Sequence, residues 1–211
     1  MKTRRNAGFT ILELVLVIIV VVILVGLMLP TLPRGGRSGR IYCTSNQKQI
    51  SLAFRMWANE HAEKFPMELT GAEGGTKESA IQGLPLATFK IISNELNNPK
   101  PLTCPEDKRR KRVTDFTQLT SKNLSYFLGV DASEKAPQTI LLGDRNLCIN
   151  GQPTNGFVQI TDWSTVTWGA DIHKYQGNIG LADGSAHQVT DFVFQKQLGA
   201  TGLTTNRFAI P

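Results

Sequence analysis

The feature that most constrains this chain is an apolar run near its start. Residues 14–29 (LVLVIIVVVILVGLML) contain no polar side chain, and segment 9–31 carries one charge, Glu13. As a helix, the 21 residues before Pro30 rise about 1.5 Å each, a length of about 31 Å that matches the roughly 30 Å of a bilayer core. A lone strand in lipid would leave its backbone unpaired, so we expect a transmembrane helix over residues 9–31.

Charge around this run predicts its orientation. Lys2, Arg4 and Arg5 precede it and favour a cytoplasmic N-terminus. The run is longer than the apolar stretch of a secretory signal and lacks a small-residue cleavage site. We therefore expect a single-pass inner-membrane protein whose C-terminal domain is periplasmic. The carboxylate of Glu13 would be costly in lipid, so this residue is expected to have a function.

The start of the chain then matches a family. Gly8-Phe9-Thr10-Ile11-Leu12-Glu13, after a basic leader and before an apolar helix, resembles the N-terminus of type IV prepilins and type II secretion pseudopilins. The resemblance implies that a prepilin peptidase removes the leader, residues 1–8, by cutting between Gly8 and Phe9. It also implies that Phe9 is then N-methylated, and that Glu13 neutralises the terminal amine of a neighbouring subunit during filament assembly.

Later motifs extend this resemblance to prepilin-like proteins with a C-terminal H-X9-DG signature. They are Cys43-Thr-Ser-Asn46-Gln-Lys-Gln49-Ile50, Phe65-Pro66, Cys104-Pro105-Glu-Asp107, Gly143-Asp144-Arg145-Asn146, and His173 with nine residues before Asp183-Gly184. The sequence after Gly184 departs from the family pattern, in which a histidine follows more closely. The implied partners are the prepilin peptidase, other pilin or pseudopilin subunits, and secretion or pilus assembly machinery.

The remaining chain predicts an α+β fold. Residues 32–40 (LPRGGRSGR) read as a Gly/Arg/Pro-rich linker where the long N-terminal helix is bent or broken. A helix is expected to resume near residue 44, with Ile50, Ala53, Phe54 and Trp57 on the face that packs on the sheet. Segment 41–211 is long enough for one pilin-like globular domain, with this helix laid on a small antiparallel sheet.

Strand patterns support that sheet. The segments 139–142, 157–161 and 166–168 are rich in β-formers. Residues 178–189 read as two strands joined by a tight hairpin turn at Asp183-Gly184, the residue pair that best accepts positive φ. Here His173, Asp183 and Gly184 are predicted to form a structural turn motif.

Three cysteines permit three single disulfides, and spacing alone does not choose among them. We favour a pair between Cys43 and Cys104, which would tie the start of the helix to the loop at Pro105. Cys148 would then be free and buried beside Leu147 and Ile149.

Metal and catalytic motifs are weak in this chain. Major pseudopilins often hold calcium near the C-terminus, so a calcium site using Asp162, Asp171 or Asp183 is the alternative to having no cofactor. No nucleophile elbow, zinc-protease pair or phosphate loop occurs, and we predict no enzymatic activity. An anchored extracytoplasmic enzyme remains a minor alternative.

Charge is distributed in patches. The net charge is +6, but basic residues gather at the leader, at residues 34–40 and at residues 108–112, so the rest of the chain is slightly acidic. This pattern argues against general nucleic-acid binding. The alternative function is an anchored binding module for DNA, another polyanion or a surface ligand. The favoured function is a structural subunit of a type II secretion pseudopilus or type IV pilus-like filament, which can reach the cell surface after assembly.

Overall fold

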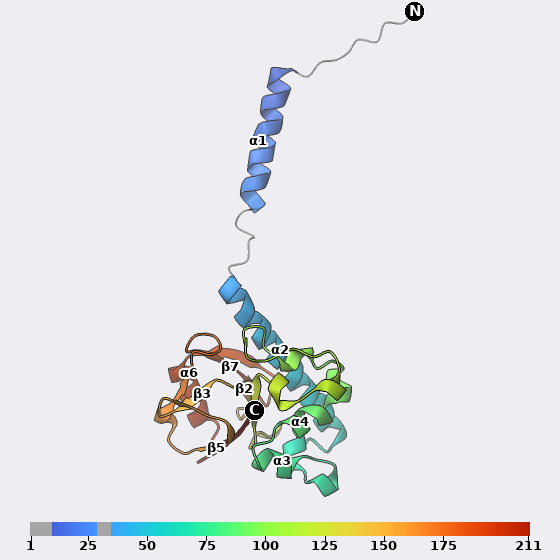
Figure 1. Ribbon diagram of the computed structural model, residues 1–211, viewed down its shortest axis with the longest axis vertical. Helices are drawn as coiled ribbons and strands as arrows, with labels where there is room; N and C mark the ends of the chain where they lie inside the picture. The colour runs from blue at the N-terminus through green and yellow to red at the C-terminus, as the bar shows by residue number, and fades with distance from the viewer. Residues whose placement is uncertain (1–9, 29–34) are drawn as a thin grey trace, which may run out of the picture. The chain divides into compact units, whose positions relative to one another are not determined.

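The computed structural model describes residues 10–28 and 35–211 (Figure 1). Within these residues the α-helices are α1 (Ile11–Met28), α2 (Gly35–Glu60), α3 (Lys77–Ile81), α4 (Leu86–Ile91), α5 (Ser93–Leu96) and α6 (Asp191–Ala200). Short 3-10 helices are η2 (Pro66–Glu68), η3 (Gly71–Glu73), η4 (Lys100–Leu102), η5 (Phe116–Gln118), η6 (Ser121–Asn123) and η7 (Trp163–Thr165).

The described part of the apolar run is the helix α1, which has 18 residues. Among residues 10–28 and 35–211, no helix combines the length and the apolarity that crossing a membrane requires. The predicted transmembrane helix, the single-pass membrane topology and the inner-membrane localisation with a periplasmic domain are therefore wrong.

The prediction of an α+β fold with an antiparallel sheet is confirmed. The strands are β1 (Tyr126–Gly129), β2 (Ile140–Asp144), β3 (Leu147–Ile149), β4 (Gln152–Pro153), β5 (Gly156–Ile160), β6 (Val166–Trp168), β7 (Gly177–Leu181), β8 (Ala186–Val189) and β9 (Asn206–Ile210). Six form one sheet in the order β5-β9-β1-β2-β7-β8, and β4-β3-β6 form a second. All of these strand pairs are antiparallel.

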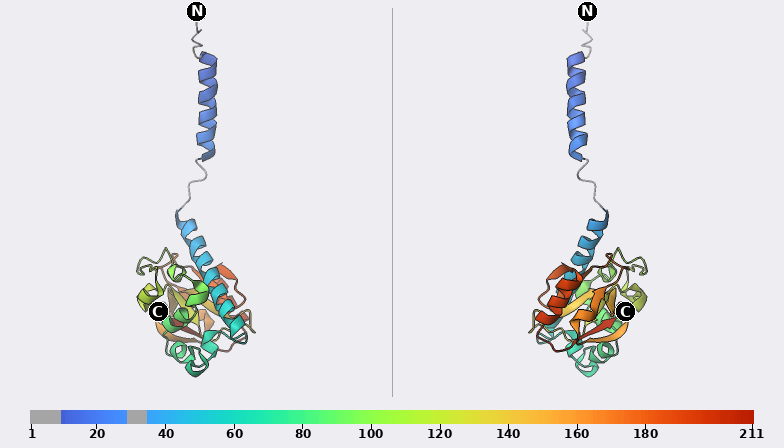
Figure 2. Two further views of the ribbon diagram at one scale, coloured as in Figure 1. Left: turned by 90° about the vertical axis from the view of Figure 1, so that its right-hand side faces the viewer. Right: turned by 90° about the vertical axis from the view of Figure 1, so that its left-hand side faces the viewer.

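Two hydrophobic cores lie on opposite faces of the six-stranded sheet. Along β1, Tyr126 and Leu128 join the core that contains residues of α2, whereas Phe127 joins the core that contains residues of α6. This alternation follows from the two-residue period of a strand. α2 and α6 accordingly lie on opposite sides of the sheet (Figure 2). The two cores belong to one compact unit, Gly39–Pro211.

α2 begins earlier than the sequence indicated. Residues 35–40 are helical, although 32–40 was expected to be a linker and the helix to start near residue 44. Residues 29–34 lie outside the described residues. The expected core face is confirmed, because Ile50, Ala53, Phe54 and Trp57 are all buried. Once the buried part of α2 is formed, each residue added at its end makes another backbone hydrogen bond without a new nucleation step, so the helix extends through these residues despite the glycines.

The C-terminal hairpin differs from its prediction in its turn. β7 and β8 are paired, with Gly180 opposite Ala186. The amide of Gly184 donates to Leu181, and Gly184 alone has positive φ, +88°, in the Asp183-Gly184 pair. The loop is thus a turn closed by one left-handed glycine, as in three-residue hairpin loops, and not a two-residue turn with both residues at positive φ.

Candidate functional site

Four segments that are distant in the sequence meet in a buried polar cluster. Cys43 of α2 is bonded to Cys104, with Cα atoms 5.2 Å apart, which is the pairing favoured from the sequence. Asp144 comes from the end of β2, and His173 from the segment between β6 and β7. Both cysteines are at most 1% exposed. The disulfide therefore holds the first half of α2 against the loop that carries Cys104.

The carboxylate of Asp144 accepts three hydrogen bonds within the cluster. Its Oδ2 accepts hydrogen bonds from the backbone amide of Asn178 at 2.7 Å and from the side-chain amide of Asn178 at 2.9 Å. Its Oδ1 accepts from the side chain of Gln47 at 3.2 Å. Burial penalises the charged form and raises the pKa of Asp144 to about 7, although these donors act against the shift.

His173 faces both Asp144 and the disulfide. Its Nε2 lies 3.5 Å from Oδ2 of Asp144 and 3.6 Å from Sγ of Cys104. Burial lowers the pKa of His173 to about 4. The residue has φ of +58°, and Lys174 and Tyr175 are also left-handed. Three consecutive non-glycine residues in this region store backbone strain, which persists only where surrounding contacts impose it.

A buried ion pair joins the cluster to the loop after Cys104. Arg145 donates from Nε and Nη2 to the two carboxylate oxygens of Asp107 at 2.7 and 2.8 Å. The Arg145 side chain is 10% exposed and that of Asp107 is fully buried. Two parallel hydrogen bonds of this kind fix orientation as well as charge. Arg145 follows Asp144 directly, so the pair also positions the end of β2.

The cluster uses residues from four of the five motifs associated with the H-X9-DG resemblance. Gln47 follows Cys43 on α2, Asp107 follows Cys104, Arg145 follows Asp144, and His173 begins the last motif. Comparison with protein-family models, curated proteins and solved structures gives no match. The family resemblance stays a prediction, and the function is interpreted from geometry.

The other predicted site residues lie apart from the cluster. Asp183 accepts a hydrogen bond from the amide of Ser185 at 2.8 Å, so it shapes the hairpin turn. Asp162 accepts from the amide of Ser164, and Asp171 pairs with Arg109 at 2.7 Å. Each proposed calcium ligand is thus engaged within the chain: Asp183 and Asp162 by a residue two positions later, and Asp171 by the distant Arg109. Within residues 10–28 and 35–211, the structure brings these aspartates into no group that could share an ion.

The predicted assembly residue lies at the start of α1. Glu13 accepts from the amide of Thr10 at 3.3 Å, and the amide of Glu13 donates to the Thr10 hydroxyl at 3.3 Å. This reciprocal pair is a capping box, which satisfies two backbone donors at the helix N-terminus. The predicted cleavage and methylation residues, Gly8 and Phe9, lie outside the described residues.

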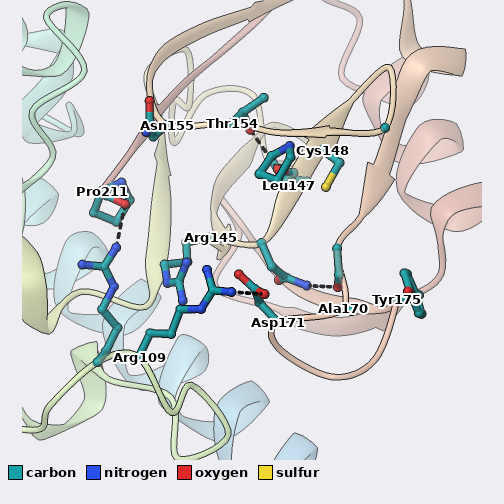
Figure 3. A pocket seen from close by; sticks show the side chains of 15 residues that line it. Arg109, Arg145, Leu147, Cys148, Thr154, Asn155, Ala170, Asp171, Tyr175 and Pro211 are labelled. Carbon is teal, nitrogen blue, oxygen red and sulfur yellow. Dashed lines mark hydrogen bonds and ion pairs between the residues drawn. The ribbon is translucent and has the colours of Figure 1, made fainter.

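An open pocket of about 390 Å³ lies beside Arg145 (Figure 3). Its arginines are engaged within the chain, because Arg109 pairs with Asp171 and Arg110 donates to the backbone oxygen of Pro211 at 2.9 Å. Cys148 borders the pocket, and burial raises the pKa of its thiol. The thiol is therefore mostly protonated at neutral pH and is a weak nucleophile.

Sequence reasoning found the motif residues but missed how they meet. Asn178 was considered only as the start of a strand, yet it makes two of the three hydrogen bonds to Asp144. The available signal was a polar residue in a strand that is otherwise apolar or glycine, since a buried amide requires partners. The cluster is buried in this structure, with Asp144 0% exposed, and its contacts join α2, β2 and the Cys104 loop.

Proposed function

We propose that this chain is a pilin-like structural subunit that assembles through α1 into a filament of the type II pseudopilus or type IV pilus kind. The observation that carries the proposal is the exposure of α1. Every side chain from Ile11 to Leu27 is exposed, and all except Glu13 are apolar or glycine. An apolar surface of this extent requires a partner in water.

The pattern of α1 favours several partners over one. A helix that packs on a single neighbour has one apolar stripe, whereas a helix that is apolar all round is buried on every side. Burial of one Val, Leu or Ile side chain contributes roughly 1.5–3 kcal/mol. A bundle of α1 helices from successive subunits would bury all faces at once, as the core of a filament requires.

The globular unit holds α2 firmly, as we expect of the part of a subunit that lies on the outside of a filament. The disulfide ties α2 to the Cys104 loop, and Gln47 of the same helix bonds to Asp144 of β2. These links hold α2 against the six-stranded sheet. A filament subunit needs such a fixed attachment of α2, because force applied to the filament reaches the globular unit through its helical segment.

The resemblance of residues 8–13 to the N-termini of prepilins supports proteolytic removal of the leader. We infer that a prepilin peptidase cuts between Gly8 and Phe9 and that Phe9 becomes N-methylated. Intact-mass analysis of the chain isolated from its native host tests this step, because the mature form begins with methylated Phe9. A chain that retains residues 1–8 in the assembled state would contradict it.

The geometry gives less support to polyanion binding. In the run 108–112, Arg109 and Arg110 are engaged as described, and Lys108 donates to the backbone oxygen of Pro105 at 3.1 Å. Phosphate binding needs cations that are free to approach the ligand. The buried cluster likewise gives no support to an enzyme.

Substitution in α1 tests the assembly function directly. Val21, in the middle of α1, is 51% exposed, and Val21→Asp would place a carboxylate inside the bundle. An unpaired buried carboxylate costs several kcal/mol, so the critical concentration for filament formation should rise at least about 100-fold. Sedimentation and electron microscopy of the full chain measure the change.

The control makes the same kind of change in the globular unit. Phe192 of α6 is 74% exposed, so Phe192→Asp removes an exposed apolar side chain outside α1. Filaments of this variant should form as in the wild type. Equal effects of Val21→Asp and Phe192→Asp, or a wild-type chain that stays monomeric, would show that α1 is not the assembly element.

A further inference from the structure

We propose that Cys43, Cys104, His173 and Asp144 form a binding site for a zinc-class divalent metal ion when the disulfide is reduced. The same residues would then connect α2, the Cys104 loop and β2 in either of two ways. In the oxidised chain the link is the covalent disulfide, and in the reduced chain it is the metal ion.

The ligand atoms of Cys43, Cys104 and His173 are close together, and reduction of the Cys43–Cys104 bond lets the two sulfurs separate so that both can bind one ion. Within the described part of the chain, the Cys43, Cys104 and His173 ligand atoms form the one group of this kind, and they all lie within 4.8 Å of one another. Sulfur and nitrogen bound to tetrahedral zinc at about 2.3 and 2.1 Å are about 3.6 Å apart. The distance from Cys104 Sγ to His173 Nε2 is 3.6 Å.

Asp144 lies beside His173 and becomes the fourth ligand when its carboxylate moves toward the sulfurs, because it is not among the residues whose ligand atoms all lie within 4.8 Å of one another. Nitrogen and oxygen at adjacent corners of a tetrahedral zinc site are about 3.4 Å apart. The distance from His173 Nε2 to Asp144 Oδ2 is 3.5 Å. Two sulfurs, one imidazole nitrogen and one carboxylate oxygen are a donor set that suits zinc, which takes four ligands of these types.

The surroundings hold these ligands in place. Asn178 and Gln47 orient the Asp144 carboxylate through three hydrogen bonds. The His173 side chain is 1% exposed, and its Nδ1 has no hydrogen-bond partner among the described residues. The polar contacts of His173 are at Nε2, which faces Cys104 and Asp144. The hydrogen bonds of Asn178 and Gln47 to Asp144 are outer contacts of the kind that orient metal ligands, whereas, within the part of the chain that the structure describes, Nδ1 of His173 lacks the outer acceptor that a metal-bound histidine usually has.

Exchange between the two forms requires a two-electron reductant. The protein disulfide accepts two electrons and two protons and its sulfur–sulfur bond breaks, while a dithiol reductant becomes a disulfide, or a phosphine takes oxygen from water and becomes a phosphine oxide. Metal binding then displaces the two thiol protons to solvent and gives two thiolate ligands. Transfer of electrons back to a disulfide-class oxidant re-forms the Cys43–Cys104 bond and releases the ion.

The test uses the full chain, Co²⁺ as a spectroscopic probe and a phosphine reductant that does not compete for metal. The reduced chain should bind one Co²⁺ with thiolate charge-transfer and tetrahedral d–d bands, and Zn²⁺ should displace it. The oxidised chain should show neither band. Absence of stoichiometric binding by the reduced chain, or equal binding by the oxidised chain, would overturn the proposal.

Variants distinguish this site from thiols in an unfolded chain. His173→Gln and Asp144→Asn should each lower the affinity by more than the roughly 10–100-fold caused by loss of an outer partner. Cys148→Ser and His187→Gln are the matched controls and should bind as the wild type does. If Cys148→Ser weakens binding as much as His173→Gln, the ion is bound by loose thiols and the site does not exist.

A stability measurement covers the case in which reduction loosens the fold. Zn²⁺ should raise the thermal midpoint of the reduced chain and leave that of the oxidised chain unchanged, because a ligand stabilises only the state that binds it. A reduced chain whose midpoint does not respond to Zn²⁺ would refute the site, whether or not that chain is folded before the metal is added.

Discussion

Oδ2 of Asp144 lies 3.5 Å from Nε2 of His173, and their side chains are 0% and 1% exposed. Burial raises the pKa of Asp144 from 3.8 to about 7 and lowers the pKa of His173 from 6.5 to about 4. Between about pH 4 and pH 6.5, both side chains are therefore neutral in the folded chain, whereas both are charged in the unfolded chain. The pair has opposite effects on the pH dependence of stability.

We expect these effects to separate in single variants. The folded chain keeps the Asp144 proton that the unfolded chain loses, so Asp144 makes stability fall as pH rises from about 4 to 7. The unfolded chain gains a proton on His173 that the folded chain lacks, so His173 makes stability fall as pH drops from about 6.5 to 4. In the wild type these slopes largely cancel.

Urea unfolding of the oxidised chain across this range measures the slopes. Asp144→Asn should become more stable with rising pH, and His173→Gln less stable, each by at most about 1.4 kcal/mol per pH unit. The wild type is the control, and its slope should lie between those of the two variants. Slopes that depart from the wild type in the same direction in both variants would contradict this account of the pair.

Loss of the disulfide should destabilise the globular unit substantially. Cys43 and Cys104 are separated by 61 positions, and opening a loop of this size costs about 4 kcal/mol in the chain-entropy description. The double variant Cys43→Ala with Cys104→Ala should show this loss in urea unfolding. Reductant should shift the wild type and Cys148→Ser equally and leave the double variant unchanged. A reductant effect on the double variant would implicate another bond.

Two ion pairs of equal length should differ in their contribution because they differ in burial. Arg145 and Asp107 are 2.7 Å apart with side chains 10% and 0% exposed. Asp107→Ala leaves a buried arginine unpaired and should cost about 3–5 kcal/mol in unfolding free energy.

The exposed pair is the matched control. Arg109 and Asp171 are also 2.7 Å apart, but their side chains are 69% and 31% exposed. Asp171→Ala should therefore cost no more than about 1 kcal/mol. Similar losses for Asp107→Ala and Asp171→Ala would show that burial does not set the strength of the Arg145 pair.

The two roles of Glu13 can be separated. Glu13→Gln keeps a side chain that can complete the capping box with Thr10 but removes the charge, whereas Thr10→Ala removes the cap and keeps the charge. If Glu13 pairs with a neighbour's amine, Glu13→Gln should impair filament assembly with unchanged helix content by circular dichroism. Thr10→Ala should weaken the helix end by about 1 kcal/mol and still assemble.

The reverse result would assign Glu13 to the cap alone. In that case Glu13→Gln assembles normally, while Thr10→Ala and Glu13→Ala both fail. Electron microscopy of the three full-length variants at one concentration gives the comparison. The capping box makes this design necessary, because Glu13→Ala removes the charge and the cap together.

Local sequence patterns predicted much of the secondary structure. The helical spacing of Ile50, Phe54 and Trp57 indicated the buried face of α2, and the strand prediction for residues 166–168 coincides with β6. Periodicity identifies these elements because burial repeats with backbone geometry. β1 and β9 were missed, although both are central to the six-stranded sheet. Both strands are buried on nearly every residue, so they lack the alternation of apolar and polar residues that marks a half-buried strand.

The apolar run shows where a local pattern misleads. Its composition correctly indicated a helix, which is α1. Its predicted membrane role is wrong, because no helix among residues 10–28 and 35–211 combines the length and the apolarity that crossing a membrane requires. Helix ends depend on caps such as the Thr10–Glu13 pair, which hydropathy does not register.

By itself, the sequence determined the apolar helix, the core face of α2, the β7–β8 hairpin and a favoured disulfide. Only the tertiary structure decided that His173, Asp144 and the Cys43–Cys104 bond share one buried cluster, and that Asn178 and Gln47 hold it. The reason is physical. Helices and turns depend on neighbours a few residues away, whereas the cluster depends on strand order and on chain segments that are brought together by burial of two separate cores.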